Sequence, residues 1–216
     1  MSNPESFIDE VNEEVRRDRL YGLMRRWGWL AVLAVLLLVG GAAWTEWRSA
    51  RERVAAQAFG DAVLAASAIA DPAARAAAIA SLEPLLPGQA ELLALLEAGT
   101  LADVDGAAAR ARLLALAEAE GTEPLYRDLA LMKAMLSGGT GDPARDGAIL
   151  EALASPGAPF RGLALEAQAL RALEAGDEAT AVTLLRLLSE EAGATDTLRR
   201  RAVQTMVALG AAPEPA

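Results

Sequence analysis

The side chains that most enzymes use for covalent or metal chemistry are missing from this chain. It contains no cysteine and no histidine, which excludes disulfides, thiolate nucleophiles, imidazole bases and nearly all zinc sites. The only lysine, Lys133, precedes Ser137 by four residues, so both would lie on one face of a helix. Such a pair can act as base and nucleophile when the lysine is desolvated, but both residues adjoin the turn SGGTGD and are expected to be hydrated. The sequence therefore predicts a protein that is not an enzyme and holds no cofactor or metal ion.

One uncharged stretch, WGWLAVLAVLLLVGGAAW from Trp27 to Trp44, dominates the N-terminal part of the chain. A helix of this length spans roughly 27 Å, close to the hydrocarbon thickness of a bilayer. Each of its leucines and valines favours insertion by about 0.3 to 0.6 kcal/mol at the helix centre. We therefore predict a single transmembrane helix over residues 27–47. The alternatives are a buried core helix and a cleaved signal peptide, although the charged lead before Trp27 is long for a signal peptide.

Tryptophans and arginines flank this apolar run at both ends. Amphipathic indole rings prefer the headgroup region, so all four tryptophans are predicted to lie at the two membrane interfaces: Trp27, Trp29, Trp44 and Trp47. Five arginines precede the run, including Arg25 and Arg26, and three follow it closely. Because basic residues stay on the cytoplasmic side, we predict a cytoplasmic amphipathic segment over residues 1–26 and a helical domain over residues 48–210 on the opposite side.

The composition of this domain limits its fold and its partners. Hydrophobic residues make up 53% of the chain, mostly alanine and leucine, and aromatic residues only 4%, which favours helices packed through small side chains. The formal net charge of −10 falls entirely on the residues after Arg53. An acidic domain repels phosphate backbones, so nucleic acid is not an expected partner. The lipid bilayer is an expected partner through the transmembrane helix alone. The expected fold class is all-α.

Two kinds of helix-start signal alternate along the domain. Asp71, Asp105, Asp142 and Asp177 recur at nearly even intervals, and an aspartate at such a position accepts hydrogen bonds from the free amides of a first helical turn. Prolines 87, 124 and 159 fall between them and open further apolar runs. This period predicts a tetratricopeptide-like solenoid, in which each helix pair buries its apolar face against the next. Side chains also repeat at an interval of 34 residues, which is the spacing of Asp71 and Asp105. Examples are Tyr126-Arg127 with Phe160-Arg161, Leu136 with Leu170, Leu150 with Leu184 and Leu153 with Leu187.

We expect about four helix pairs, a capping helix and a disordered tail. These cover about residues 54–86, 87–121, 122–157, 158–193, 196–209 and 211–216. Repeated aromatic and basic positions open two successive helices and are candidates for a groove that binds a partner: Tyr126, Arg127, Phe160 and Arg161. The alternative is that these side chains pack between repeats, as repeated positions usually do in solenoids.

Three features together resemble one bacterial family over nearly the whole chain. They are the segment SFIDEVNEEVRRDRLYGLMRRWGWL, the apolar helix ending in GGAAWTEWRSAR, and the alanine-rich helix pairs. The chain resembles the tetratricopeptide-repeat-like family of ancillary SecYEG translocon subunits of Gram-negative bacteria. The resemblance implies a single-pass protein of the cell inner membrane, with its N-terminus in the cytoplasm and its helical domain in the periplasm. It also implies two partners, the SecYEG translocon and a membrane-anchored periplasmic chaperone.

These patterns support one hypothesis and leave two others open. The first is a membrane-tethered, non-catalytic scaffold that binds proteins at the periplasmic side of the translocon and assists the traffic or folding of exported proteins. A second is a tethered hydrolase built on Lys133 and Ser137. A third is a transmembrane regulator that contacts a cytosolic signalling protein through the N-terminal helix around Val11 and Val15. The second repeat lacks the aromatic residues of a typical tetratricopeptide unit, so its partners could differ from those of the family.

Overall fold

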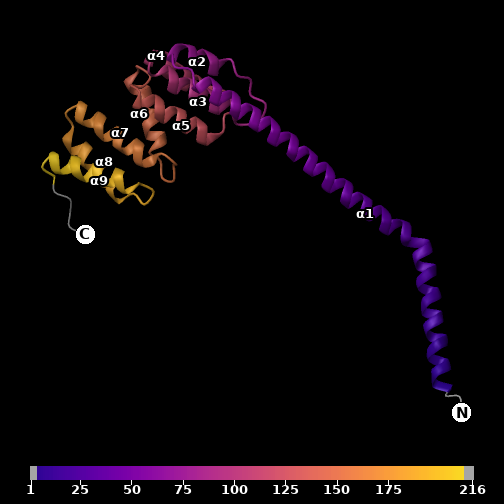
Figure 1. The fold of residues 1–216 in the computed structure, drawn as a ribbon. Coiled ribbons are helices and arrows are strands. Elements are labelled where there is room, and N and C mark those ends of the chain that lie inside the picture. The colour runs from indigo at the N-terminus through magenta and orange to yellow at the C-terminus, as the bar shows by residue number, and fades with distance from the viewer. Residues whose placement is uncertain (1–3, 212–216) are drawn as a thin grey trace. The chain divides into compact units, whose positions relative to one another are not determined.

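The computed structural model describes the backbone of residues 4–211 and the side chains of residues 29–30 and 33–211. Over this range the chain forms nine α-helices and no strand (Figure 1), so the predicted all-α class is confirmed. The helices are α1 (Pro4–Ser67), α2 (Pro72–Ala80), α3 (Gln89–Leu101), α4 (Gly106–Glu118), α5 (Pro124–Leu136), α6 (Pro143–Leu153), α7 (Arg161–Glu174), α8 (Glu178–Glu190) and α9 (Asp196–Ala208).

The chain divides into two compact units after Ala58. The first unit contains most of α1, and the second contains the end of α1 together with α2 to α9. The predicted boundaries of the transmembrane segment, at residues 26/27 and 47/48, rest on hydropathy rather than on packing, and they stay predictions. Residues 212–216 of the predicted tail lie outside the described residues.

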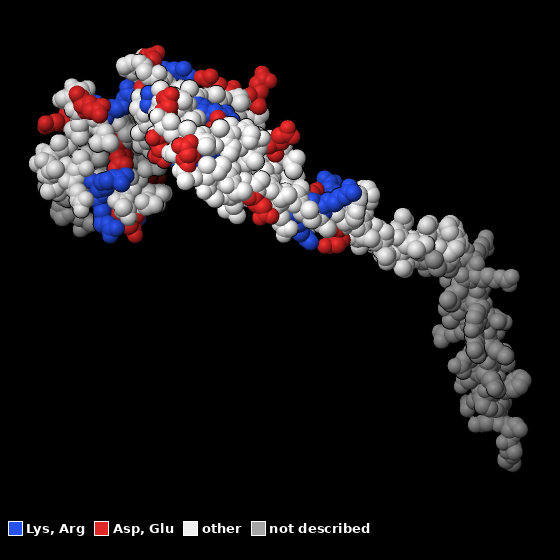
Figure 2. All heavy atoms as spheres, turned by 45° about the horizontal axis from the view of Figure 1, so that its top comes forward, with Lys and Arg blue, Asp and Glu red and all other residues white. Residues whose placement is uncertain are grey.

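Helix α1 covers the whole predicted transmembrane segment. From Leu33 to Val39 its side chains are exposed and apolar, and no charged residue occurs between Leu33 and Glu46 (white spheres of α1 in Figure 2). Among the residues whose side chains are described, no helix has an apolar stretch long enough to span a bilayer. Trp27, Gly28, Ala31 and Val32 of the predicted span are outside that set.

The aspartate and proline signals start helices as predicted. Each of the four aspartates is the N-terminal cap of a helix and accepts backbone hydrogen bonds from its first turn: Asp71 for α2, Asp105 for α4, Asp142 for α6 and Asp177 for α8. Pro124 is the first residue of α5, and α3 and α7 begin two residues after Pro87 and Pro159. These starts are local properties of the sequence, because a cap needs only its own side chain and the next three amides.

Three of the four aspartate-capped helices also share one register of burial. Counting from the cap, the fourth, eighth and eleventh residues are buried in α4, α6 and α8: Ala109, Leu113, Leu116; Asp146, Leu150, Leu153; Ala181, Leu185, Leu188. Leu150 therefore corresponds to Leu185. The predicted match of Leu150 with Leu184 and of Leu153 with Leu187 is wrong by one residue, since Leu187 is 41% exposed. In these three helices the buried positions therefore follow the capping aspartate, whereas α2, capped by Asp71, buries Ala76 and Ile79.

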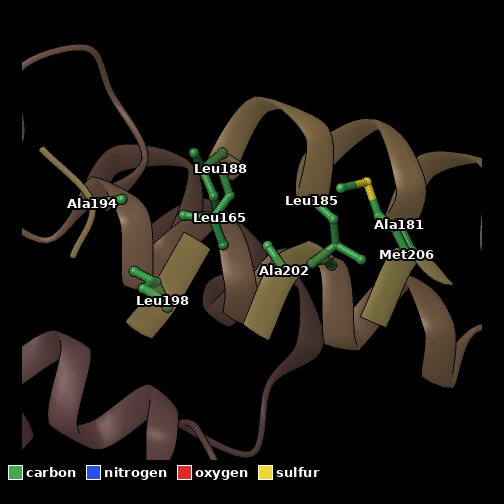
Figure 3. Close-up of a cluster of buried hydrophobic side chains, with 9 residues drawn as sticks. Leu165, Ala181, Leu185, Leu188, Ala194, Leu198, Ala202 and Met206 are labelled. Carbon is green, nitrogen blue, oxygen red and sulfur yellow. The ribbon is translucent and has the colours of Figure 1, made fainter. Parts of the chain in front are cut away.

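Helices that follow one another along the chain pack together, from α2 on α3 to α8 on α9. The largest buried cluster joins α7, α8 and α9, and Figure 3 shows Leu165 and Leu188 directed toward each other across it. A second cluster joins α3, α4 and α5 through alanines and leucines. Helix α9, which is the predicted capping helix, packs on α8 and α7. This sequential packing is consistent with a helical-repeat solenoid.

The cap of α4 offers a direct test of how much these helix starts contribute. Asp105 accepts hydrogen bonds from the amides of Ala107 and Ala108 at 2.9 and 3.0 Å. We predict that Asp105→Ala lowers the free energy of unfolding by about 1 kcal/mol, because two amides lose their partner. Urea unfolding of the full chain in detergent, followed by far-UV circular dichroism, measures the loss.

The matched control is Asp103→Ala, which removes the same charge from an exposed residue that caps no helix. We expect this control to unfold within a few tenths of a kcal/mol of the wild type, as surface substitutions usually do. Equal losses in the two variants would contradict a capping role for Asp105.

Candidate functional site

A hollow of about 670 Å³ lies between α5, α6 and α7 in the second unit. Its wall combines apolar and charged side chains: Leu136 from α5, Asp146 from α6, and Glu166, Leu170, Arg171 and Glu174 from α7. A concave surface with a few convergent polar groups is the usual form of a binding site. We therefore take this hollow as the candidate functional site.

Asp146 is the unusual residue of the hollow. It is only 6% exposed and occupies the fourth position after the cap of α6. The same position holds a buried alanine in α4 and α8, namely Ala109 and Ala181. A carboxylate at a core position is costly unless hydrogen bonds and an opposite charge compensate it. The structure must therefore supply partners for this group.

Two residues compensate the Asp146 carboxylate. Its Oδ1 accepts hydrogen bonds from the Thr140 amide at 2.7 Å and from the Thr140 hydroxyl at 2.6 Å. Its Oδ2 lies 3.3 Å from Nη1 of Arg171 on α7. Burial raises the pKa of Asp146, but the bonds from Thr140 and the Arg171 guanidinium together outweigh it, so the pKa lies below the ordinary value of 3.8. The group is thus ionised at neutral pH and joins α6 to α7.

Gly139 leaves the room that this carboxylate needs. Its φ of +73° is in the left-handed region, where an L side chain costs roughly 1–2 kcal/mol. A Cβ atom built on it would lie 2.2 Å from Oδ2 of Asp146, which is far inside contact distance. The GGTG turn before α6 therefore shapes the hollow for steric reasons.

Arginines connect the walls of the hollow to the next elements. Arg171 also donates to the carbonyl of Pro143 at the start of α6. Glu166 accepts two hydrogen bonds from Arg201 of α9, which raise the pKa of that guanidinium. Two of the three carboxylates of the hollow therefore already have an arginine partner. The third, Glu174 at the end of α7, is exposed and forms no ion pair within the described part of the chain.

Two leucines give the hollow an apolar edge. Leu136 is 60% exposed and Leu170 is 49% exposed, and both line the hollow. Leu136 is the last residue of α5, and Leu170 lies in the C-terminal half of α7; the match that the sequence repeat gives between them stays a prediction. Exposed leucines are common singly, but here two of them border one concavity. This arrangement makes apolar surface available beside the charged wall.

The predicted groove residues of α5 lie near its start. Tyr126 is half-buried, and Arg127 at the next position is exposed. The Arg127 guanidinium donates to the carbonyl of Thr122 at 3.2 Å, which ties the helix to the connection before it. Neither residue lines the hollow. Their role in a groove stays a prediction.

The corresponding residues of α7 take part in packing between elements. Phe160, the residue before α7, is half-buried against the cluster formed by Met132, Leu150, Leu153 and Ala164. Arg161 donates to the carbonyl of Ala154 at 2.7 Å and to Oε2 of Glu191 at 2.5 Å. Its side chain is largely buried. These contacts favour the packing alternative for Phe160 and Arg161, and a groove role for them also stays a prediction.

The predicted membrane-interface residues are described in part. Trp29, Trp44 and Trp47 are exposed, whereas the side chains of Trp27, Arg25 and Arg26 lie outside the described residues. The rings of Trp44 and Trp47 have centroids 5.3 Å apart, and the Arg51 guanidinium lies 4.1 Å from the Trp47 ring centroid. A cation over an indole face is a favourable contact. The contact lies at the C-terminal end of the predicted span.

In the structure, Lys133 and Ser137 are not arranged as a base and a nucleophile. Ser137 is the C-terminal cap of α5, and its carbonyl accepts a hydrogen bond from Arg110 at 2.9 Å. The two side chains, both in the described part of the chain, are not hydrogen-bonded to each other. Among the residues with described side chains, no three carboxylates gather closely enough to hold a metal ion.

Sequence reasoning missed the hollow, although one signal for it exists. In GDPARD the second aspartate follows the capping Asp142 by four residues, where α4 and α8 have alanine. A charge in the core register of a repeat points to a specific partner, and here that partner is Arg171. Recognising it required the correct register between α6 and α8.

Comparisons with protein-family models, with curated proteins and with solved structures find no match to this chain. The family named from the sequence therefore stays an expectation. The function of the hollow has to be inferred from its own residues.

The contact between Gly139 and Asp146 makes a quantitative prediction. Gly139→Ala should lower the free energy of unfolding by about 1–2 kcal/mol through backbone strain and by a further 1–3 kcal/mol, roughly, because the buried carboxylate must leave its partners. Gly141→Ala, at a φ of +87° with open space around its Cβ, should show the strain alone. Urea unfolding of both variants measures the difference.

The double variant Gly139→Ala with Asp146→Ala separates the two contributions. In a chain that already carries Asp146→Ala, Gly139→Ala should lower the free energy of unfolding by no more than Gly141→Ala does in the wild type, because the carboxylate that would clash with the new Cβ is absent. If Gly139→Ala and Gly141→Ala were equally destabilising in the otherwise wild-type chain, the proposed steric role of Gly139 would be wrong.

Proposed function

We propose that this chain is a membrane-tethered, non-catalytic scaffold whose helix pairs form a tetratricopeptide-like solenoid that binds segments of other proteins. The observation that carries this proposal is the stack of aspartate-capped helices with an open hollow of mixed polarity between α5, α6 and α7. Stacked helix pairs of this kind present extended surfaces that bind partner proteins. The absence of cysteine and histidine from the sequence fits a binding role better than a catalytic one.

The sequence supports a tether over residues 27–47. Leucines and valines from Leu33 to Val39 are exposed on α1 without a protein partner in the described chain, and hydrocarbon is the solvent that suits them. Trp44, Trp47 and Arg51 follow this stretch as aromatic and basic side chains, which is the composition of a membrane interface.

The arginine bias supports one orientation of the tether. With more arginines before residue 27 than directly after residue 47, the N-terminus is cytoplasmic and the helical domain is on the other side. In a Gram-negative cell this places the protein in the inner membrane with the domain in the periplasm. The family resemblance then suggests the SecYEG translocon and a membrane-anchored periplasmic chaperone as partners, and a role in the traffic or folding of exported proteins.

A charge in the middle of the tether tests this proposal. We predict that Leu37→Asp removes the protein from the membrane fraction, because a central aspartate costs about 2.5–3.5 kcal/mol of insertion free energy and the leucine's own contribution is lost as well. Carbonate extraction of membranes followed by immunoblotting measures the distribution. The matched control is Val207→Asp, which places the same charge on an exposed valine of α9 and should leave the protein in the membrane fraction.

Affinity purification from native membranes in mild detergent tests the proposed partners, in cells that express the wild type, Leu37→Asp or Val207→Asp. The wild type and Val207→Asp should recover translocon subunits and a periplasmic chaperone, and Leu37→Asp should recover neither. A Leu37→Asp protein that resists carbonate extraction would refute the tether. A wild-type purification without either partner would refute the assignment to the translocon.

A further inference from the structure

We infer that the hollow between α5, α6 and α7 receives a segment of a partner polypeptide in which a leucine-like side chain lies beside a lysine or arginine. This inference rests on the proposed function, because it names the class of partner that the scaffold binds. It follows from three properties of the wall: its exposed leucines, its charge and the state of its buried polar atoms.

The leucines set the apolar half of the ligand. Leu136 and Leu170 leave about half or more of their surface in water, although both border the same concavity. Covering such a side chain with another apolar side chain is favourable in proportion to the area removed from water. An aliphatic residue of a partner would therefore find apolar surface on two sides.

The carboxylates set the charged half of the ligand. The wall holds Asp146, Glu166 and Glu174 against a single guanidinium, that of Arg171. Arg201 adds a second positive charge from α9 at Glu166, which still leaves one carboxylate in excess. That carboxylate is Glu174, which has no partner within the described residues and is exposed on the same helix as Leu170. A cationic side chain is the complement of this wall, whereas an acidic ligand would be repelled by it and by the net charge of the domain.

The buried polar atoms favour a polypeptide over a small polar ligand. Within the described chain, no buried side-chain nitrogen or oxygen lacks a hydrogen-bond partner, and Asp146 is fully engaged by Thr140 and Arg171. A small ligand would find no free buried donor or acceptor to fix it. The groups left available are exposed leucines and an exposed carboxylate, which suit side chains presented by an extended backbone.

The test uses the full-length protein in detergent and fluorescein-labelled peptides of repeated triplets. The probe is a peptide of Leu-Arg-Ala triplets, and its matched controls replace every arginine by glutamate or every leucine by serine. Fluorescence anisotropy measures the dissociation constant at low and at high salt. We expect the Leu-Arg-Ala peptide to bind, its affinity to fall as salt rises, and both control peptides to bind at least about tenfold more weakly.

Two substitutions in the hollow have matched controls elsewhere in the chain. Glu174→Gln should weaken binding of the Leu-Arg-Ala peptide about two- to fivefold, the range expected for one exposed charge pair. Glu190→Gln removes the equivalent charge from the end of α8 and should change nothing. Leu170→Asn should weaken binding about tenfold through lost apolar contact, while Leu187→Asn on α8, at a similarly exposed leucine, should bind as the wild type does.

The results distinguish this inference from the proposed function. Equal binding of the basic and acidic peptides, or unchanged binding by Glu174→Gln and Leu170→Asn, would overturn the inference. If those variants also still recovered translocon subunits from native membranes, the scaffold would stand and only its assigned hollow would be wrong. Peptide binding that depends on Glu174 and Leu170 supports the inference, even if no translocon subunit is recovered and the proposed location fails.

Discussion

Burial of apolar side chains between neighbouring helices is the interaction on which the second unit depends. Helices α2 to α9 have between 9 and 14 residues each, and isolated helices of this length are marginal in water. The caps contribute about 1 kcal/mol each: Asp71, Asp105, Asp142 and Asp177. They determine where the helices start, but this energy is too small to keep the helices folded. Stability must come from the alanines and leucines that each helix buries against the next.

The hollow is a local exception to this apolar register. Asp146 replaces the alanine that α4 and α8 bury at the same position, and its ionised carboxylate requires Thr140, Arg171 and the free space above Gly139. Such a group adds little net stability, because its desolvation offsets its pairing. What it does provide is a charged wall at a junction of three helices, where an apolar residue would have extended the core. A departure of this kind is expected at a functional site.

The sequence predicts local features well and contacts between elements less well. The capping aspartates and the helix-opening Pro124 depend on residues within one turn, and the structure confirms them. It also confirms the all-α class, which follows from the alanine- and leucine-rich composition. The predicted match of α6 with α8 is wrong by one residue, because it uses the 34-residue interval from Asp71 to Asp105, whereas the capping Asp142 and Asp177 are 35 residues apart. The burial of Asp146 is explained by Thr140 in the preceding turn and by Arg171 on the next helix, α7, and the contact with α7 cannot be read from the sequence around Asp146. The functional role of residues 27–47 stays a prediction from hydropathy.

Native-state hydrogen exchange of the full chain is the most direct test of the central claim that these helices are stable only as a stack. We predict that amides of α7, α8 and α9 open with one common free energy, because their side chains share one buried cluster. Substituting Leu185, which is buried in the middle of that cluster, by alanine should lower the protection of all three helices together. Independent exchange of each helix, or a loss of protection confined to α8, would show that the helices are stable individually.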